Sequence, residues 1–215
     1  MGRHAAAERS ALCDTFERVG PSAPPLCDPW STAELAAHLV IRDSRPDLAL
    51  GNVVPPLADR LDRGMEEYAT RPWEELVHLV RSGPPAWSPT RMPFADEVAN
   101  LAEFFIHHED VLRGEGQVGP QRELSPELEA ALWRQLKRAA PLLSRRLPTG
   151  VVLVAPGHGR AAVKGPTQAG TAVLTGAPGE LLLTLFGRAR VAAVEFSGPE
   201  GAVRALRQAL QVPAQ

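Results

Sequence analysis

The spacing of apolar residues changes once along this chain, and that change constrains the fold more than any other feature. Over the first two thirds, apolar side chains recur at three- and four-residue intervals, as amphipathic helices require. After Gly150 they occur in short β-branched or alternating runs such as GVVLVAP and TAVLTGAP, which are typical of strands. We therefore predict a two-part α+β chain, with a helical domain at residues 1–147 and a small α+β domain at residues 148–215.

Caps and prolines mark where the helices begin and end. The tetrapeptide S-T-A-E from Ser31 to Glu34 is a capping box that opens a helix, and this helix weakens before Pro46. Other helices are expected before Gly20, after Pro56, after Pro72, from about Phe94 to Arg113 and after Ser125. Four long helices with short connecting ones predict a bundle with antiparallel neighbours. The strand-rich remainder predicts an antiparallel sheet with helices on one face.

Composition excludes several classes of protein. The apolar share is 44% and the charged share 22%, ordinary values for a globular protein with a substantial core. A net charge of −2 with both signs interspersed argues against nucleic acid and anionic membranes as partners. No apolar run approaches the ~18 residues of a membrane span and no secretory signal is visible, so we expect a cytoplasmic protein. Cys13 and Cys27 are too few for a disulfide framework or a thiolate zinc site, and neither lies in a recognisable activating context.

A glutamate occupies an apolar stretch of the longest expected helix. Glu103 lies in VANLAEFFI, where almost any helical face is apolar enough to be buried. A lone carboxylate there would cost several kcal/mol or take up a proton, so in the absence of a partner we expect its pKa to rise.

Two histidines could bind a metal ion together with Glu103. His107 lies four residues after Glu103 and therefore on the same helical face, and His38 lies in the equally apolar context LAAHLVI. Two imidazoles and one carboxylate form the ligand set of catalytic zinc or non-haem iron, and helical bundles build such sites in their cores. We predict that His38, Glu103 and His107 bind a divalent metal, zinc or another.

Neighbouring polar residues leave alternatives open. His108 could replace His107 as ligand, although it lacks a carboxylate four residues earlier. Asp110 could orient an imidazole from behind the metal, or could be a solvated residue near the helix end. Glu74 and His78 share the spacing of Glu103 and His107, but the pattern of their helix places them on a solvent-facing side.

Other catalytic motifs are missing from the sequence. It contains no G-x-S-x-G nucleophile motif. The glycine pattern GEGQVG follows a helix rather than a strand, so it is not a dinucleotide-binding loop.

Two segments together resemble a known family. DPWSTAELAAHLV is similar to the W-[ST]-x-x-[DE]-L-x-x-H-L signature of the mycothiol-dependent maleylpyruvate isomerase family, and EFFIHHED is similar to its E-x-x-x-H-x-x-D signature. This family belongs to the DinB-like superfamily of metal-binding four-helix bundles. The resemblance implies a DinB-like bundle followed by a sterol-carrier-like domain, with His38, Glu103 and His107 as metal ligands.

The resemblance also implies a function. It predicts zinc as cofactor, mycothiol or a similar small thiol as co-substrate, and an isomerase or S-transferase acting on a small electrophile. No substrate-binding residue of the isomerase can be matched, so the substrate stays open, as does the oligomeric state. The alternative is a non-catalytic metal-binding protein with a structural or ligand-sensing role. Because a structural zinc site is expected to close with four protein ligands and only three are apparent, we favour the enzyme.

Overall fold

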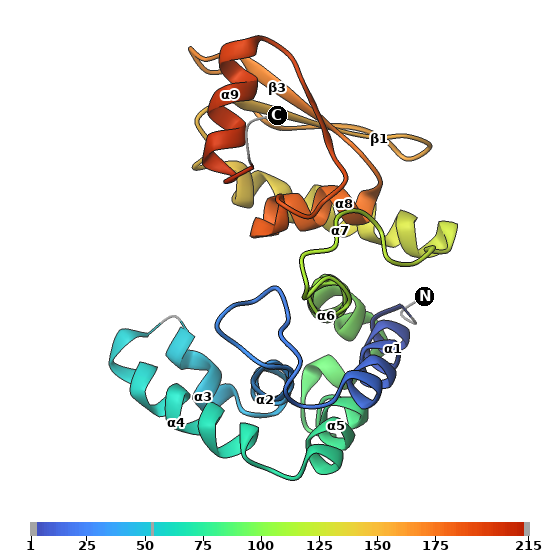
Figure 1. The fold of residues 1–215 in the computed structure, drawn as a ribbon, viewed down its shortest axis with the longest axis vertical. Coiled ribbons are helices and arrows are strands. Elements are labelled where there is room, and N and C mark those ends of the chain that lie inside the picture. The colour runs from blue at the N-terminus through green and yellow to red at the C-terminus, as the bar shows by residue number, and fades with distance from the viewer. Residues whose placement is uncertain (1–3, 53, 213–215) are drawn as a thin grey trace. The chain divides into compact units, whose positions relative to one another are not determined.

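The structure is a computed structural model that describes residues 4–52 and 54–212 (Figure 1). The chain divides between Glu115 and Gly116 into two compact units, which we call the helical unit and the sheet unit. Their mixture of helices and a four-stranded sheet confirms the predicted α+β class. Within the described residues, no helix is long and apolar enough to cross a membrane.

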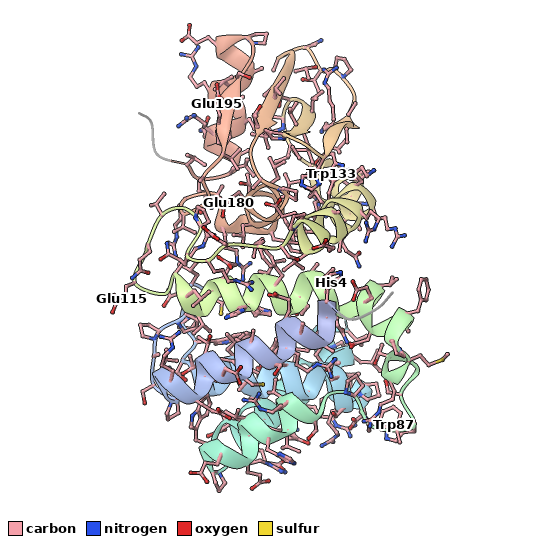
Figure 2. The ribbon with its side chains drawn as sticks, turned by 90° about the vertical axis from the view of Figure 1, so that its right-hand side faces the viewer. His4, Trp87, Glu115, Trp133, Glu180 and Glu195 are labelled. Carbon is pink, nitrogen blue, oxygen red and sulfur yellow. The ribbon has the colours of Figure 1, made fainter. Side chains whose placement is uncertain are left out.

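The helical unit is built from amphipathic helices around one apolar core. Helix α1 runs alongside α6, α5 packs on α1 and α2, and α4 packs on α2 (Figures 1 and 2). Core residues such as Leu12, Phe16, Leu35, Leu76 and Phe104 are at most 1% exposed, and burying each contributes about 1.5–3 kcal/mol. The elements are α1 (His4–Val19), α2 (Thr32–Ser44), α3 (Pro46–Ala49), η1 (Leu50–Asn52), η2 (Pro55–Leu57), α4 (Ala58–Ala69), α5 (Trp73–Ser82), η3 (Pro89–Arg91) and α6 (Pro93–Leu112).

The start of α2 confirms the predicted capping box. The Ser31 hydroxyl accepts from the backbone N–H of Glu34, and the Glu34 carboxylate accepts from the N–H of Ser31 at 2.6 Å. Two otherwise unpaired backbone donors are thereby satisfied, which fixes the first turn of the helix. The orientation of α2, and with it the face that carries His38, follows from this start.

The loop between α1 and α2 is held against the end of α6. The N–H of Leu26 donates to the carbonyl oxygen of Asp110 at 3.0 Å. Gly114 allows this close approach, because a Cβ atom at that position would lie 1.9 Å from the carbonyl oxygen of Pro24. The loop thereby brings Cys27 to the part of α6 that carries His107.

The sheet unit contains a mixed sheet with the order β2-β1-β3-β4. Strand β1 is central and almost fully buried. Helix α7 packs on α8 and β2, and α9 packs on β3 and β4. The elements are α7 (Pro126–Ser144), β1 (Gly150–Ala155), β2 (Gly159–Lys164), β3 (Thr171–Thr175), α8 (Pro178–Leu183), η4 (Thr184–Arg188), β4 (Glu195–Ser197) and α9 (Glu200–Ala209).

The prediction of a purely antiparallel sheet is wrong. Strands β1 and β2 form an antiparallel hairpin, but β3 pairs with β1 in parallel, with Val152 opposite Val173. After β2 the chain passes the start of β1 and pairs with its other edge. Gly150 makes room for this passage, since a Cβ atom there would meet the carbonyl oxygen of Gly165 at 2.9 Å.

The two units divide earlier in the chain than the predicted boundary at residues 147 and 148. Helix α7, expected to complete the helical bundle, belongs to the sheet unit. Its Trp133 is only 4% exposed. The ammonium of Lys164 on β2 also donates to the carbonyl oxygen of Arg145 at the end of α7, at 2.9 Å. An amphipathic pattern identifies an apolar helical face but not the partner that covers it.

Candidate metal centre

The three predicted ligands meet between α2 and α6. Oε1 of Glu103 lies 3.2 Å from Nε2 of His38 and 3.3 Å from Nε2 of His107. The ring centroids of the two histidines are 5.4 Å apart. Two residues from one helix and one from another, 65 positions away in sequence, therefore present their donor atoms to one point.

Glu103 is less buried than the sequence indicated. A quarter of its side chain is exposed, and a fifth of the His38 side chain. Its surroundings are also not purely apolar, because Nε of Arg42 lies 3.4 Å from the same carboxylate oxygen. The carboxylate faces two imidazoles, a guanidinium and solvent. Glu103 is therefore not an unpaired buried charge.

The expected rise in the pKa of Glu103 is wrong for this environment. Burial alone would raise the pKa of Glu103, but hydrogen bonds from His107 and His38 and the charge of Arg42 outweigh it and hold the pKa well below its usual range. For His107, burial alone would lower the pKa, but Asp110, Cys27 and Glu103 outweigh it and raise the pKa well above its usual value. The centre thus favours an ionised carboxylate.

Asp110 orients the His107 imidazole and is not a solvated residue at the helix end, the other role that the sequence left open. Its Oδ2 lies 2.9 Å from Nδ1 of His107, and its side chain is fully buried. A carboxylate at Nδ1 fixes the ring so that Nε2 points at Glu103. Such a carboxylate behind a histidine also makes the imidazole a stronger metal ligand.

Arg42 is a residue of the centre that the sequence analysis missed. It lies four residues after His38 and thus on the same face of α2, a spacing that could have revealed it. Besides its contact with Glu103, its guanidinium donates to the Asn100 side chain and, at 2.8 Å, to the carbonyl oxygen of Ala99. Both acceptors are on α6, so Arg42 ties the two helices together beside Glu103.

Cys27 is a second residue that the sequence analysis missed. Its Sγ lies within 4.8 Å of donor atoms of both His107 and Asp110. The surrounding sequence carries no signal for this placement, which results from the loop that folds onto the end of α6. Cys27 is a free, partly buried thiol, as expected, but the sequence did not indicate these two neighbours.

The alternative residues lie elsewhere. His108 is directed toward α1, where its Nε2 lies 3.0 Å from the Thr15 hydroxyl, and it does not approach Glu103 in the described structure. Glu74 and His78 are both exposed, as predicted from the pattern of their helix.

The donor set fits a small divalent cation. A tetrahedral zinc ion with ligand bonds of about 2.0–2.1 Å places neighbouring donor atoms about 3.3 Å apart. The two nitrogen–oxygen separations, 3.2 and 3.3 Å, match two edges of such a tetrahedron. All three ligand atoms lie within 4.8 Å of one another.

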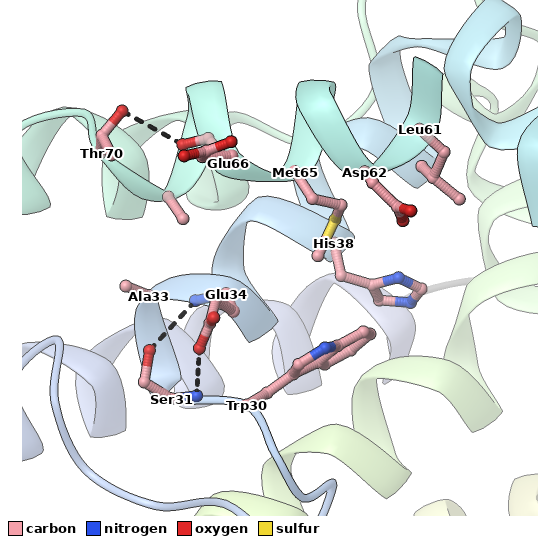
Figure 3. Close-up of a pocket in the computed structure, with 11 residues that line it drawn as sticks. Trp30, Ser31, Ala33, Glu34, His38, Leu61, Asp62, Met65, Glu66 and Thr70 are labelled. Atoms are coloured by element: carbon pink, nitrogen blue, oxygen red, sulfur yellow. Dashed lines mark hydrogen bonds between the residues drawn. The ribbon is translucent and has the colours of Figure 1, made fainter. Parts of the chain in front are cut away.

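A cavity of about 730 Å³ adjoins His38 between α2 and α4 (Figure 3). Trp30 forms one wall, and its ring packs on the His38 imidazole with centroids 5.2 Å apart. This volume suits a small-molecule ligand. Since His38 belongs to both the cavity and the ligand triad, a ligand in the cavity would lie next to the metal centre.

Two solved structures resemble this chain in fold. One is the crystal structure of the mycothiol-dependent maleylpyruvate isomerase, with a TM-score of 0.57, and the other is a histidine-to-alanine mutant of that isomerase, with a TM-score of 0.55. Each is 16% identical to this chain, and each comparison covers 92% of both chains. At this identity the likeness establishes a shared fold. No protein-family model matches the sequence, and a search of the curated proteins gives no significant match.

Proposed function

We propose that the protein is a zinc- or other divalent-metal-dependent enzyme that uses a low-molecular-weight thiol such as mycothiol. It acts on a small electrophile as an isomerase or S-transferase. The observation that carries this proposal is the convergence of His38, Glu103 and His107 at 3.2–3.3 Å beside an open cavity. The fold shared with a mycothiol-dependent isomerase supports the choice of a thiol as co-substrate.

The proposal extends to the fold family. The helical unit is a DinB-like four-helix bundle, in which α1, α2, α5 and α6 are the main helices and α6 and α2 carry the ligands. The sheet unit is the sterol-carrier-like domain. The shared fold over 92% of both chains supports this assignment.

Zinc bound by these residues supplies a Lewis acid that lowers the pKa of a coordinated thiol toward neutrality. The side chains around the centre do the remaining work. Asp110 holds the His107 ring with Nε2 directed at the centre, and Arg42 holds the Glu103 carboxylate from α2. Trp30 packs on the His38 ring and limits its rotation.

A thiolate formed at this centre has two natural reactions. In isomerisation its sulfur adds to a conjugated double bond, the resulting single bond rotates, and elimination restores both the double bond and the thiolate. In S-transfer a carbon–sulfur bond forms while the leaving group departs with its electron pair. Both need a small electrophile beside the thiol, and the cavity at His38 has room for one.

The alternative is a non-catalytic metal-binding protein with a structural or ligand-sensing role. A structural zinc site closes with a fourth protein ligand. The candidate is Cys27, whose Sγ clusters with His107 and Asp110 but not with His38 and Glu103, so it would have to move to reach the metal. A catalytic site keeps the fourth position for a ligand from solution.

Titration of the Co²⁺-loaded protein with mycothiol tests the proposal. We expect a sulfur-to-cobalt charge-transfer band that saturates near one thiol per metal, and its absence in His107→Ala. Cobalt that already shows a sulfur band without added thiol, lost in Cys27→Ser, would favour the structural alternative. Cobalt that binds but develops no band with thiol would contradict the proposed function.

A further inference from the structure

The cavity beside His38 has an unusual charge. Of its lining residues Glu34, Asp62 and Glu66 are acidic, and none of the lining residues in the described structure is a lysine or arginine (Figure 3). A cavity of this composition carries a negative potential next to the metal centre.

Two of these carboxylates form no ion pair within the part of the chain that the structure describes. Asp62 and Glu66 are exposed residues four positions apart on α4 that line the cavity, a spacing at which like charges repel. Neither forms an ion pair with any other residue that the structure describes. Glu67 on the same helix, by contrast, lies 3.7 Å from Arg71 and does not line the cavity. Unpaired like charges facing a cavity destabilise the protein slightly unless a ligand offsets them.

The remaining wall also suits a cation. The Trp30 indole lines the cavity, and indole is the aromatic group that binds cations best through its ring face. Met65 and Leu61 add apolar groups to the lining, and Met65 extends from α4 toward His38 (Figure 3). An aromatic ring together with unpaired carboxylates is a combination that recognises an ammonium group.

We infer, on the basis of the proposed function, that this cavity receives a positively charged part of the thiol or of the electrophilic substrate. The reacting end of that ligand extends past His38 to the metal centre. The same carboxylates repel a dianionic acid, so the group that enters this cavity is cationic rather than dicarboxylic.

Two thiols of matched length and opposite charge test this inference. The Co²⁺-loaded protein is titrated at low ionic strength with 4-aminobutane-1-thiol and with 4-mercaptobutanoate, and the sulfur-to-cobalt band gives both affinities. We expect the amine to bind about tenfold more tightly, as two nearby carboxylates in a solvated cavity predict. The preference should shrink to about twofold or less in the double variant Asp62→Asn/Glu66→Gln.

The double variant Asp59→Asn/Glu67→Gln is the matched control. It removes the same charge from the same helix but outside the cavity, and it should keep most of the tenfold preference. Equal affinities in the wild type, a preference for the carboxylate, or a preference that survives Asp62→Asn/Glu66→Gln would each overturn the inference and leave the thiol function standing. A cobalt-loaded protein without a sulfur band for either thiol overturns the proposed function, and the inference falls with it.

Discussion

Two helices of this protein carry a glutamate and a histidine four residues apart, and the two pairs differ in everything but spacing. On α6, Glu103 and His107 approach to 3.3 Å and meet His38 and Arg42 from α2. On α5, Glu74 and His78 are exposed, and the only polar contact of the His78 ring within the described structure is a long one, 3.5 Å, to the Ser82 hydroxyl. Spacing on one helix creates a pair, but a second helix is needed to make a centre.

The difference follows from the face that each helix buries. Helix α5 turns Leu76, Val77 and Val80 inward, which leaves its acidic and histidine positions in solvent. Helix α6 is covered on more sides, and the face with Glu103 and His107 lies against α2. Partial removal from water strengthens every electrostatic interaction of that pair and makes a bound cation the natural complement.

The largest expected effect is the loss of zinc affinity when a ligand of the α6 centre, but not the histidine of the α5 pair, is removed. We predict that His38→Ala and His107→Ala lower zinc affinity by more than about a hundredfold, because each removes a direct ligand, whereas loss of an outer partner costs 10- to 100-fold. His78→Ala should leave the affinity unchanged. Competition with a chelator of known affinity measures all three, and a wild-type affinity in either of the first two variants would remove that residue from the ligand set.

Asp43 is a second carboxylate near the centre, but unlike Glu103 it has no histidine partner in the described structure. Burial raises the pKa of Asp43 to about 6, although Arg42 and Arg9 lower it and Asp96 and Glu103 add to the rise. Its favourable contribution is therefore full below about pH 4 and is lost as the pH rises through about 6.

We predict that Asp43→Asn stabilises the protein at pH 7 by roughly 3 kcal/mol, the equivalent of about two pKa units. Near pH 4 the variant and the wild type should be equally stable. Urea unfolding at both pH values measures the difference. A gap that does not grow between pH 4 and pH 6 would show that Asp43 is not desolvated in the folded protein.

Asp110 tests how far the α6 centre extends beyond its ligands. We predict that Asp110→Asn lowers zinc affinity about 10- to 100-fold, because the amide orients His107 less strongly and leaves its imidazole a weaker metal ligand. Ser82→Ala removes the side chain that contacts His78 and is the matched control on α5, with no effect expected. Zinc titration of both variants decides, and equal affinities would make Asp110 a residue of structural importance only.

Cys27 gives the smallest expected effect. We predict that Cys27→Ser keeps one zinc per chain and an affinity within about threefold of the wild type, because the proposed enzyme leaves its fourth metal position to a ligand from solution. Isothermal titration measures this. A loss comparable to that of His107→Ala would instead support a closed, structural site.

The sequence predicted features that depend on neighbouring residues and missed those that depend on packing. The capping box at Ser31 and the shared face of Glu103 and His107 are local, and both are found in the structure. The sequence alone does not place His38 beside that pair. Its position was predicted from the hypothesis that polar residues in two apolar helices bind the same metal ion. The placement of Cys27 arises from a loop whose course no local pattern indicates.

The same reasoning explains the differences in fold. The stripe of α7 predicted a helix correctly but could not show that α8 and β2 pack against it. The parallel pairing of β1 and β3 depends on where the chain crosses after the hairpin, which strand patterns do not record.

Thermal melting of two matched variants tests the central claim, that the α6 pair and not the α5 pair binds metal, most directly. Glu103→Gln and Glu74→Gln make the same chemical change at the same position of the same spacing. At a zinc concentration about a hundredfold above the Kd, mass action predicts roughly 2.7 kcal/mol of stabilisation, or roughly 5–10 °C in Tm, for the wild type. Glu74→Gln should show that full shift and Glu103→Gln little or none. An equal zinc-induced shift in wild type and Glu103→Gln would contradict the account.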